Sequence, residues 1–229
     1  MTSNLMQGKR GLIMGLANDK SIAWGIAKSL ADAGAELAFS YQGDALKKRV
    51  DPLAASLGSD TVLPCDVSDM DSVDKLFADL EAKWGKLDFI VHAIGFSDKA
   101  ELRGRYVDTS RQNFLTSMDI SVYSFTAVVA RATKMMNPGG SCLTLTYYGA
   151  ERVMPHYNVM GVANGLEAIL PLLIARGAGR VGIVASLAGY GGLPSAAAYG
   201  GSKAALINMA EAGRLQPAAV RLMDRAGYR

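Results

Sequence analysis

Cysteine and histidine are scarce in this sequence, which has two of each among its 229 residues. Cys65 and Cys142 both lie in strand-like contexts, so they provide neither a disulfide framework nor a cysteine-based metal site. His92 and His156 lack the further ligands that a zinc site needs. The sequence therefore predicts reduced thiols, a cytoplasmic location and no metal centre.

Long hydrophobic runs are also absent, and so is a strong excess of charge of one sign. No apolar run approaches the about 18 residues of a membrane span, and the short run 11–17 is followed by polar residues, unlike a signal sequence. The 24 basic and 21 acidic residues give a net charge of +3 spread along the chain, whereas a nucleic-acid binder clusters its charge. We expect neither a membrane nor a nucleic acid as a partner.

The composition is that of a soluble globular protein. Half of the residues are hydrophobic, 20% are charged, and 25 Gly stand against 7 Pro, which excludes disordered, collagen-like and coiled-coil chains. A chain of this length buries roughly three quarters of its unfolded surface and rarely splits. We therefore expect residues 1–229 to form a single domain.

Short apolar runs alternate with helical patterns along most of the chain. Strands rich in Val, Ile, Leu and Phe are expected at residues 10–15, 36–41, 60–67, 87–96, 141–147 and 180–185. Helices are expected at residues 21–33 and 72–84, each followed by a glycine. This alternation indicates parallel strands joined by right-handed crossovers, so we predict a doubly wound parallel α/β sheet of the Rossmann type.

After residue 124 the order of helix, strand and tyrosine-bearing helix occurs twice. Tyr157 and Tyr199 lie 42 residues apart, and Gly149 and Gly191 have the same offset. Two copies cannot form a solenoid, so a local duplication is the simpler interpretation. The strands at 141–147 and 180–185 either compete for one place in the sheet or lie side by side.

The turn after the first strand is suited to a pyrophosphate, although it is not a G-x-G-x-x-G motif. Gly15 permits a tight turn, and Ser21 can cap a helix whose free N–H groups face an anion. An ordinary strand-to-helix turn would account for both residues equally well. Gln42 stands after the second strand, where a carboxylate or an arginine normally contacts the cofactor ribose or its phosphate; its amide can bond hydroxyls without carrying a charge.

Several of these segments closely resemble the NADH-dependent enoyl-acyl-carrier-protein reductases, a family of the short-chain dehydrogenase/reductases. They are residues 15–25, 41–42, 65–67, 92–96, 119–121 and the stretch from 147 through 161. The resemblance covers about residues 8–163. It implies NAD(H) as cofactor and reduction of the carbon–carbon double bond of an enoyl thioester carried by acyl carrier protein, in fatty acid synthesis. It also implies a homo-oligomer, which is a tetramer in the family.

The same resemblance implies roles for individual residues. NADH would lie over Gly15, Ala17, Ser21, Ile22, Gln42, Asp66, Val67, Ala93, Ile94 and Gly95. Asp66 would hold the adenine, and residues 93–95 would line the path of the ribose. Without the resemblance, Asp66 would be interpreted as a solvated carboxylate at the end of a strand.

Reduction of an enoyl thioester leaves an enolate, whose oxygen must be stabilised as its charge develops. The resemblance assigns this task to the hydroxyl of Tyr157, with Tyr147 nearby in the substrate pocket. The family has a lysine seven residues after the main tyrosine, on the same helical face. Here that position is Asn164, which can bond the cofactor ribose but carries no charge. From the residues alone, both tyrosines could be aromatic residues at the edge of the core.

A second constellation, Ser186, Tyr199 and Lys203, resembles the Ser and Tyr-x-x-x-Lys site of ordinary short-chain dehydrogenases. Tyr199 and Lys203 are four residues apart, so on a helix the ammonium lies beside the phenol and lowers its pKa. This resemblance covers about residues 158–212, with Asn158 in the place of the helix asparagine. The chain then ends where the family continues through two more strands and a loop over the substrate, so we expect the last strands to be lacking and the tetramer to be affected.

Three functions follow from these patterns. The first is an NADH-dependent enoyl-thioester reductase, impaired by Asn164. The second is a carbonyl or alcohol dehydrogenase that uses Ser186, Tyr199 and Lys203. The third is a catalytically silent nucleotide-binding hybrid, in which residues 1–163 are like an enoyl reductase and residues 158–229 are like a truncated ordinary dehydrogenase.

Overall fold

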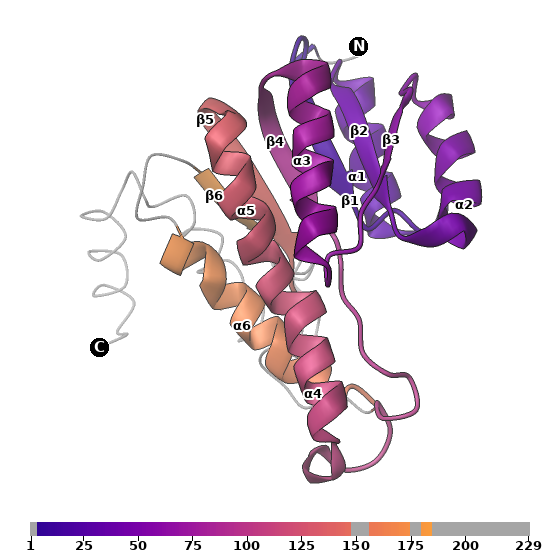
Figure 1. Ribbon diagram of the computed structural model, residues 1–229, viewed down its shortest axis with the longest axis vertical. Coiled ribbons are helices and arrows are strands. Elements are labelled where there is room, and N and C mark those ends of the chain that lie inside the picture. Colours follow the sequence, from indigo (N-terminus) through magenta and orange to yellow (C-terminus); the bar gives the residue numbers. More distant parts are fainter. Residues whose placement is uncertain (1–3, 148–155, 175–179, 185–229) are drawn as a thin grey trace, which may run out of the picture.

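A six-stranded parallel sheet with helices on both faces forms the body of the computed structural model, which describes residues 4–147, 156–174 and 180–184 (Figure 1). The strands are β1 (Arg10–Met14), β2 (Glu36–Tyr41), β3 (Thr61–Pro64), β4 (Leu87–His92), β5 (Met136–Leu145) and β6 (Arg180–Val184). Their order is β3-β2-β1-β4-β5-β6, and every neighbouring pair is parallel. The predicted doubly wound sheet is confirmed.

The helices that connect these strands include the two that the sequence pattern predicted. They are α1 (Ile22–Asp32), α2 (Gly43–Ser56), α3 (Met70–Trp84), α4 (Arg111–Met118), α5 (Ser124–Met135) and α6 (Asn158–Ile174), with a short 3-10 turn η1 (Tyr106–Asp108) and a π-helical turn η2 (Asp119–Tyr123). Helix α3 begins where Asp69 accepts a hydrogen bond from the Asp71 amide and ends at Gly85, whose φ is +70°. Helix α2, which contains Pro52, was not predicted.

Two hydrophobic clusters cover the two faces of the sheet. Leu12 and Met14 belong to the cluster that includes side chains of α3 and α5, and Ile13 belongs to the cluster that includes side chains of α1 and α2. This division follows from the alternation of side chains along a strand. Strand β1 is therefore buried on both faces, as central strands of parallel sheets are.

Two strands end three or more residues earlier than the sequence pattern predicted. Strand β3 ends at Pro64 rather than at residue 67, and β4 ends at His92 rather than at residue 96. The last residues paired with them are Tyr41 of β2, Met14 of β1 and Thr144 of β5. Cys65 and Ala93 each donate one more backbone hydrogen bond, to Tyr41 and Met14, and the pairing goes no further. Residues 65–67 and 93–96 therefore lie in loops at the carboxyl edge of the sheet.

The two strands of the duplicated pattern lie side by side. Strand β5 pairs with β4, and β6 pairs with β5 in parallel at the edge of the described sheet. The segment that leads to Tyr157 therefore takes the place next to β4. The prediction that the last strands of the family are lacking concerns residues beyond 184, which lie outside the described part of the chain.

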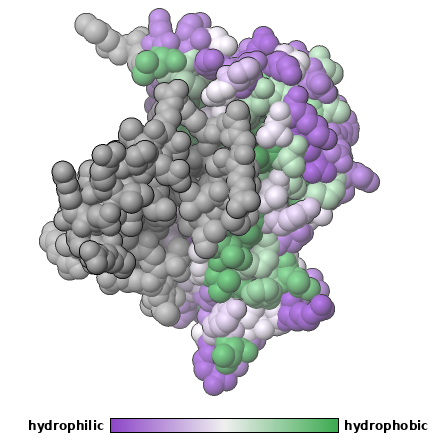
Figure 2. Space-filling model, turned by 90° about the vertical axis from the view of Figure 1, so that its left-hand side faces the viewer, coloured by the Kyte–Doolittle hydropathy of each residue, from purple (hydrophilic) through white to green (hydrophobic). Residues whose placement is uncertain are grey.

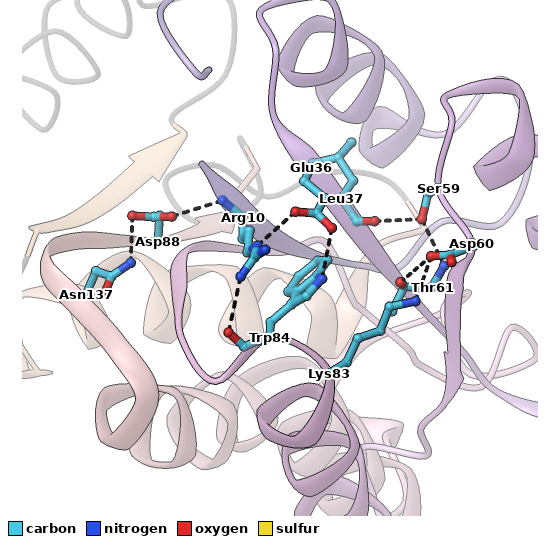
Figure 3. A network of polar contacts seen from close by, with 10 residues as sticks. All are labelled: Arg10, Glu36, Leu37, Ser59, Asp60, Thr61, Lys83, Trp84, Asp88 and Asn137. Atoms are coloured by element: carbon cyan, nitrogen blue, oxygen red, sulfur yellow. Dashed lines mark hydrogen bonds and ion pairs between the residues drawn. The ribbon is translucent and has the colours of Figure 1, made fainter. Parts of the chain in front are cut away.

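A network of polar contacts ties the strands together at their amino-terminal ends (Figure 3). The Arg10 guanidinium donates to Glu36 (2.8 Å) and to the carbonyl oxygen of Trp84 (3.2 Å). Asp88 accepts hydrogen bonds from the backbone N–H of Arg10 (2.9 Å) and from the Asn137 amide (3.1 Å). The network links β1, β2, β4 and β5 at one end and leaves the opposite, carboxyl edge free for a site.

Large hydrophobic side chains are exposed on α4, η2 and α6, namely Leu115, Tyr123, Val162 and Leu166. Figure 2 shows hydrophobic residues gathered in one region of the coloured part of this face, with hydrophilic residues along its outer edge. Within the described ranges, no helix is long and apolar enough to cross a membrane.

Candidate active site

A cleft of about 290 Å³ lies at the carboxyl edge of the sheet, among the loops that follow the first four strands. Eight of the eleven residues predicted to hold the cofactor line it: Gly15, Ala17, Gln42, Asp66, Val67, Ala93, Ile94 and Gly95. The cleft includes the point where the strand order reverses, between β1 and β4, because residues that follow both strands line it. Ligands of doubly wound sheets bind at this kind of position.

Gly15 brings the first turn close to the end of β4. Its φ is +89°, a conformation that other residues rarely adopt, and a Cβ atom at this position would collide with the carbonyl oxygen of Ala93. The predicted tight turn is confirmed. Only a glycine allows the backbone of this turn to lie so close to the residue that follows β4.

Replacing Gly15 with Ala is expected to lower the free energy of unfolding by about 3 kcal/mol, because the methyl group adds a backbone collision to a strained φ. Urea denaturation measures the change. Gly25→Ala is the matched control, because residue 25 lies inside α1 with open space around it. We expect this variant to have a free energy of unfolding up to about 1 kcal/mol higher than that of the parent. A Gly15→Ala variant as stable as the parent would contradict the close approach.

The start of α1 differs from the prediction. Ser21 occupies the N-cap position, but its side chain accepts no hydrogen bond from the helix. Its hydroxyl donates instead to the carbonyl oxygen of Asn18 (2.6 Å), and the Asn18 side chain closes the turn by accepting from the Lys20 amide (2.8 Å). The predicted capping bond was therefore wrong. Neither Ser21 nor the exposed Ile22 is among the residues that line the cleft.

At another side of the cleft, Gln42 and Asp66 are bound to each other. The Gln42 amide donates to Asp66 (2.8 Å), which also accepts from the hydroxyl (2.7 Å) and the N–H (2.9 Å) of Ser68. Burial opposes ionisation of Asp66, but these hydrogen bonds together lower its pKa below the usual value. The cleft thus contains a carboxylate that is ionised at neutral pH and held in a fixed orientation.

The predicted catalytic tyrosines lie together between β5 and α6. Tyr147 follows the end of β5, Tyr157 directly precedes α6, and their ring centroids are 5.3 Å apart with the planes tilted by 59°. The Asn164 amide donates to the Tyr157 hydroxyl (3.2 Å) and to the carbonyl oxygen of Met160 (2.5 Å). Asn164 therefore contacts the tyrosine, as the seven-residue spacing suggested, although Tyr157 lies just outside the helix.

The Tyr157 hydroxyl accepts a hydrogen bond from Asn164 and keeps its own proton. Burial raises its pKa, the hydrogen bond from Asn164 acts in the opposite direction, and the nearby Glu167 and Tyr147 raise the pKa again. The net pKa lies above the ordinary value of about 10. The hydroxyl therefore keeps its proton throughout the neutral range.

Glu167 is a feature of this region that the sequence analysis did not single out. It lies one helical turn after Asn164, is only 4% exposed, and burial raises its pKa to about 8. Its position in the sequence offered a signal, because it is the one acidic residue in the apolar helix 158–174. This carboxyl group, buried near Tyr157, is mostly neutral at pH 7.

Replacing Glu167 with Gln is expected to stabilise the protein at neutral pH. In the parent, the unfolded chain releases the Glu167 proton near pH 4.5 and the folded chain only near pH 8, so stability falls as pH rises between these values. The loss reaches about 3 kcal/mol by pH 7, and an amide at this position avoids it. Thermal unfolding between pH 5 and pH 8 measures the difference.

Glu81→Gln, at an exposed position on α3, controls for the loss of one acidic residue elsewhere. If Glu167→Gln and the parent lost stability in parallel over this pH range, the carboxyl group would not be buried in its neutral form.

The second predicted constellation cannot be compared with this geometry, since Ser186, Tyr199 and Lys203 lie outside the described residues. Among the residues that are described, no three His, Cys, Asp or Glu side chains lie together in a way that could hold a metal ion. Burial raises the pKa of the Cys65 thiol to about 12 and that of Cys142 to about 11. Neither thiol is a reactive nucleophile near neutral pH.

Comparison with known families decides the relationship. The family model described as enoyl-(acyl carrier protein) reductase matches residues 15–170. The chain belongs to this family. A second model, that of the short chain dehydrogenases, matches residues 149–222. The two matches overlap at residues 149–170, which include the stretch 158–163 where the two resemblances in the sequence meet.

Individual relatives agree with the family match. The chain is 63% identical over 199 residues to the enoyl-[acyl-carrier-protein] reductase [NADH] 1 of Rhizobium meliloti, covering 86% of this chain and 73% of the relative. It is 53% identical over 169 residues to a reductase of the same name, FabI, from Rickettsia bellii, covering 73% of this chain and 64% of the relative. The chain thus spans about two thirds to three quarters of these relatives.

Solved structures show the same similarity in three dimensions. The enoyl-(acyl-carrier-protein) reductase of Anaplasma phagocytophilum, crystallised in complex with NAD, superimposes with a TM-score of 0.77 at 56% identity, over 80% of this chain and 72% of that one. FabI from Candidatus Liberibacter asiaticus gives a TM-score of 0.76 at 50% identity, with the same coverage. The Rossmann-type fold predicted from the sequence is thus that of the family.

Proposed function

We propose that this chain catalyses the NADH-dependent reduction of the carbon–carbon double bond of an enoyl thioester carried by acyl carrier protein, a step of fatty acid synthesis. The observation that carries the proposal is the adjacency of the cleft and the tyrosine. Gly95 lines the cleft, and a Cβ atom at its position would lie 3.5 Å from the side chain of Met160. Met160 follows Tyr157 by about one helical turn, and its backbone N–H donates a hydrogen bond to the Tyr157 carbonyl oxygen (2.9 Å).

The residues of the cleft fit a dinucleotide. The crowded turn at Gly15 brings backbone N–H groups to a position suited to the pyrophosphate. Gln42 and Asp66 offer polar groups to the adenosine end, and residues 93–95 form a wall for the nicotinamide ribose. When bound, NADH supplies the hydride. Ala17, Val67, Ser21 and Ile22 complete the proposed cofactor-binding set.

Tyr157 is the proposed catalytic residue. Its protonated hydroxyl donates a hydrogen bond to the thioester oxygen and stabilises the negative charge that develops there. Asn164 donates to the same hydroxyl and so fixes its position, which differs from the ribose contact expected from the sequence. Because an amide carries no charge, its hydrogen bond lowers the pKa of the phenol less than a neighbouring ammonium would. Slow turnover is therefore part of the proposal.

An absorbance assay of NADH oxidation with a crotonyl thioester tests the function. We expect consumption of NADH that depends on both the chain and the thioester. No consumption above that of buffer, under conditions in which NADH is bound, would reject enoyl reduction and favour the silent nucleotide-binding hybrid.

A second candidate rests on the short chain dehydrogenase match at residues 149–222. In this alternative, Ser186, Tyr199 and Lys203 act on a carbonyl or an alcohol. Tyr199→Phe would then abolish activity and Tyr157→Phe would not, whereas our proposal expects the reverse. Assaying both variants with a crotonyl thioester and with a simple ketone distinguishes the two sites.

We further infer that the chain forms one domain, acts in the cytoplasm and self-associates. The exposed hydrophobic side chains on α4, η2 and α6 support self-association, since apolar side chains gathered at a surface are typical of interaction sites. Light scattering at several protein concentrations tests it; a monomer at all concentrations would reject it.

A further inference from the structure

The π-helical turn η2 is an irregular segment that lies against the cleft. It interrupts the helical path between α4 and α5 over five residues, and such turns occur frequently at functional sites. Ile120, in this turn, lines the cleft. The next residue, Ser121, is fully buried, so its hydroxyl must find its partners inside the protein.

Ser121 holds both backbone polar groups of one cleft residue. Its hydroxyl accepts a hydrogen bond from the Phe96 N–H (2.9 Å) and donates one to the Phe96 carbonyl oxygen (3.1 Å). Phe96 and the preceding Gly95 line the cleft, yet they lie beyond the end of β4, where no strand pairs with them. The hydroxyl of Ser121 therefore takes over the restraint that a sheet ladder provides elsewhere.

The same hydroxyl also contacts the helix that follows the catalytic tyrosine. The Ser121 oxygen lies 3.9 Å from the sulfur of Met160. The carbonyl oxygen of Met160 in turn accepts a hydrogen bond from the Asn164 amide. The side chain of Ser121 is thus placed between the wall of the cleft and the start of α6.

We propose that Ser121 is a positioning residue that holds the Gly95–Phe96 wall in the conformation that receives the cofactor. The inference rests on the proposed function, in which this cleft binds NADH. Without the hydroxyl, the N–H and the carbonyl oxygen of Phe96 lose their hydrogen-bond partner. The Gly95–Phe96 wall, which is already ordered in the parent, then has to become ordered when NADH binds. Preorganisation of this kind contributes to affinity by reducing the ordering cost of binding.

Fluorescence titration of NADH into the full chain, with Ser121→Ala and two companion variants, tests the proposal. We expect Ser121→Ala to weaken NADH binding about tenfold, as the loss of hydrogen bonds to a buried wall predicts. Ser121→Thr keeps the hydroxyl and is expected to bind within about threefold of the parent.

Ser124→Ala is the matched control. Ser124 is equally buried and directly follows the same turn, but it does not line the cleft. Its hydroxyl donates a hydrogen bond to the Ile120 carbonyl oxygen (2.6 Å) and is also hydrogen-bonded to Nε2 of His92 (2.9 Å). We expect this variant to lose stability but to keep its NADH affinity. Equal affinity of Ser121→Ala and the parent, or an equal loss in Ser124→Ala, would overturn the proposal.

Hydrogen exchange of the parent gives a measurement that depends on neither folding of a variant nor cofactor binding. We expect the Phe96 amide to be protected in the absence of NADH, and free exchange at Phe96 would overturn the proposal. If the parent does not bind NADH although the Phe96 amide is protected, the proposed function is rejected, and with it the role of Ser121 toward the cofactor. If the parent binds NADH but the Phe96 amide exchanges freely, only the role of Ser121 is rejected.

Discussion

Replacing Tyr157 with Phe is expected to lower kcat for enoyl-thioester reduction by about 100-fold or more, because removal of one donor from a developing oxyanion costs this much in other enzymes. NADH affinity is expected to stay within about twofold, since the hydroxyl acts on the thioester and not on the walls of the cleft. Steady-state kinetics with a crotonyl thioester and a separate NADH titration measure the two quantities.

Tyr147→Phe is the matched control for this variant. The ring of Tyr147 packs at a tilt against that of Tyr157, and the residue is 43% exposed. We expect the loss of its hydroxyl to lower kcat less than about tenfold, because a solvated hydroxyl contributes little differential stabilisation of the transition state. A Tyr157→Phe variant that turns over as fast as the parent would remove the tyrosine from the mechanism.

Replacing Asn164 with Lys is expected to raise kcat by about ten- to a thousandfold. An ammonium beside the phenol lowers its pKa by about 1 to 3 units, each worth about 1.4 kcal/mol, and so makes the hydroxyl a stronger donor. The structure adds a reason why the site can accept this charge. Glu167 lies one helical turn away with a carboxyl group of raised pKa, and a lysine at residue 164 would favour its ionised form.

The pH dependence of the reaction distinguishes a charge effect from a change in packing. In the parent, the raised pKa of Tyr157 predicts no loss of kcat from ionisation of the phenol below about pH 10. In Asn164→Lys, the loss of kcat that accompanies ionisation of the phenol is expected to begin at a lower pH. Asn164→Gln keeps the amide and introduces no charge, so we expect no increase in its kcat. A folded Asn164→Lys variant with unchanged kcat and pH profile would show that the missing charge does not limit turnover.

The sequence was sufficient to predict the sheet and most of the cleft. Strand β1 and helix α1 follow from local patterns of hydrophobic residues and from Gly15, whose backbone conformation only glycine readily adopts. Gly15 and Gln42 could be singled out because they stand after successive strands, whereas Asp66, Val67 and residues 93–95 were implied by the resemblance to the reductase family. Parallel strands bring all of these positions to one edge of the sheet. Local rules were enough wherever a residue's role depends on its own element.

What the sequence could not reveal are contacts between elements far apart in the chain. The two hydrogen bonds between Ser121 and Phe96 join residues 25 positions apart, and no periodicity indicates them. The capping prediction for Ser21 failed because Asn18 competes for its hydroxyl. The ends of β3 and β4 were misplaced because a strand stops where its neighbour turns away, which is a property of two segments rather than one.

The most direct test of the account follows the hydride itself. The chain is incubated with NADH carrying deuterium at the transferred position of the nicotinamide and with a crotonyl thioester, and the product is analysed by mass spectrometry and NMR. We predict a saturated butyryl thioester with one deuterium on its β-carbon. Recovery of unchanged crotonyl thioester, or of an alcohol formed at the carbonyl carbon, would contradict the assignment of this cleft and Tyr157 to enoyl reduction.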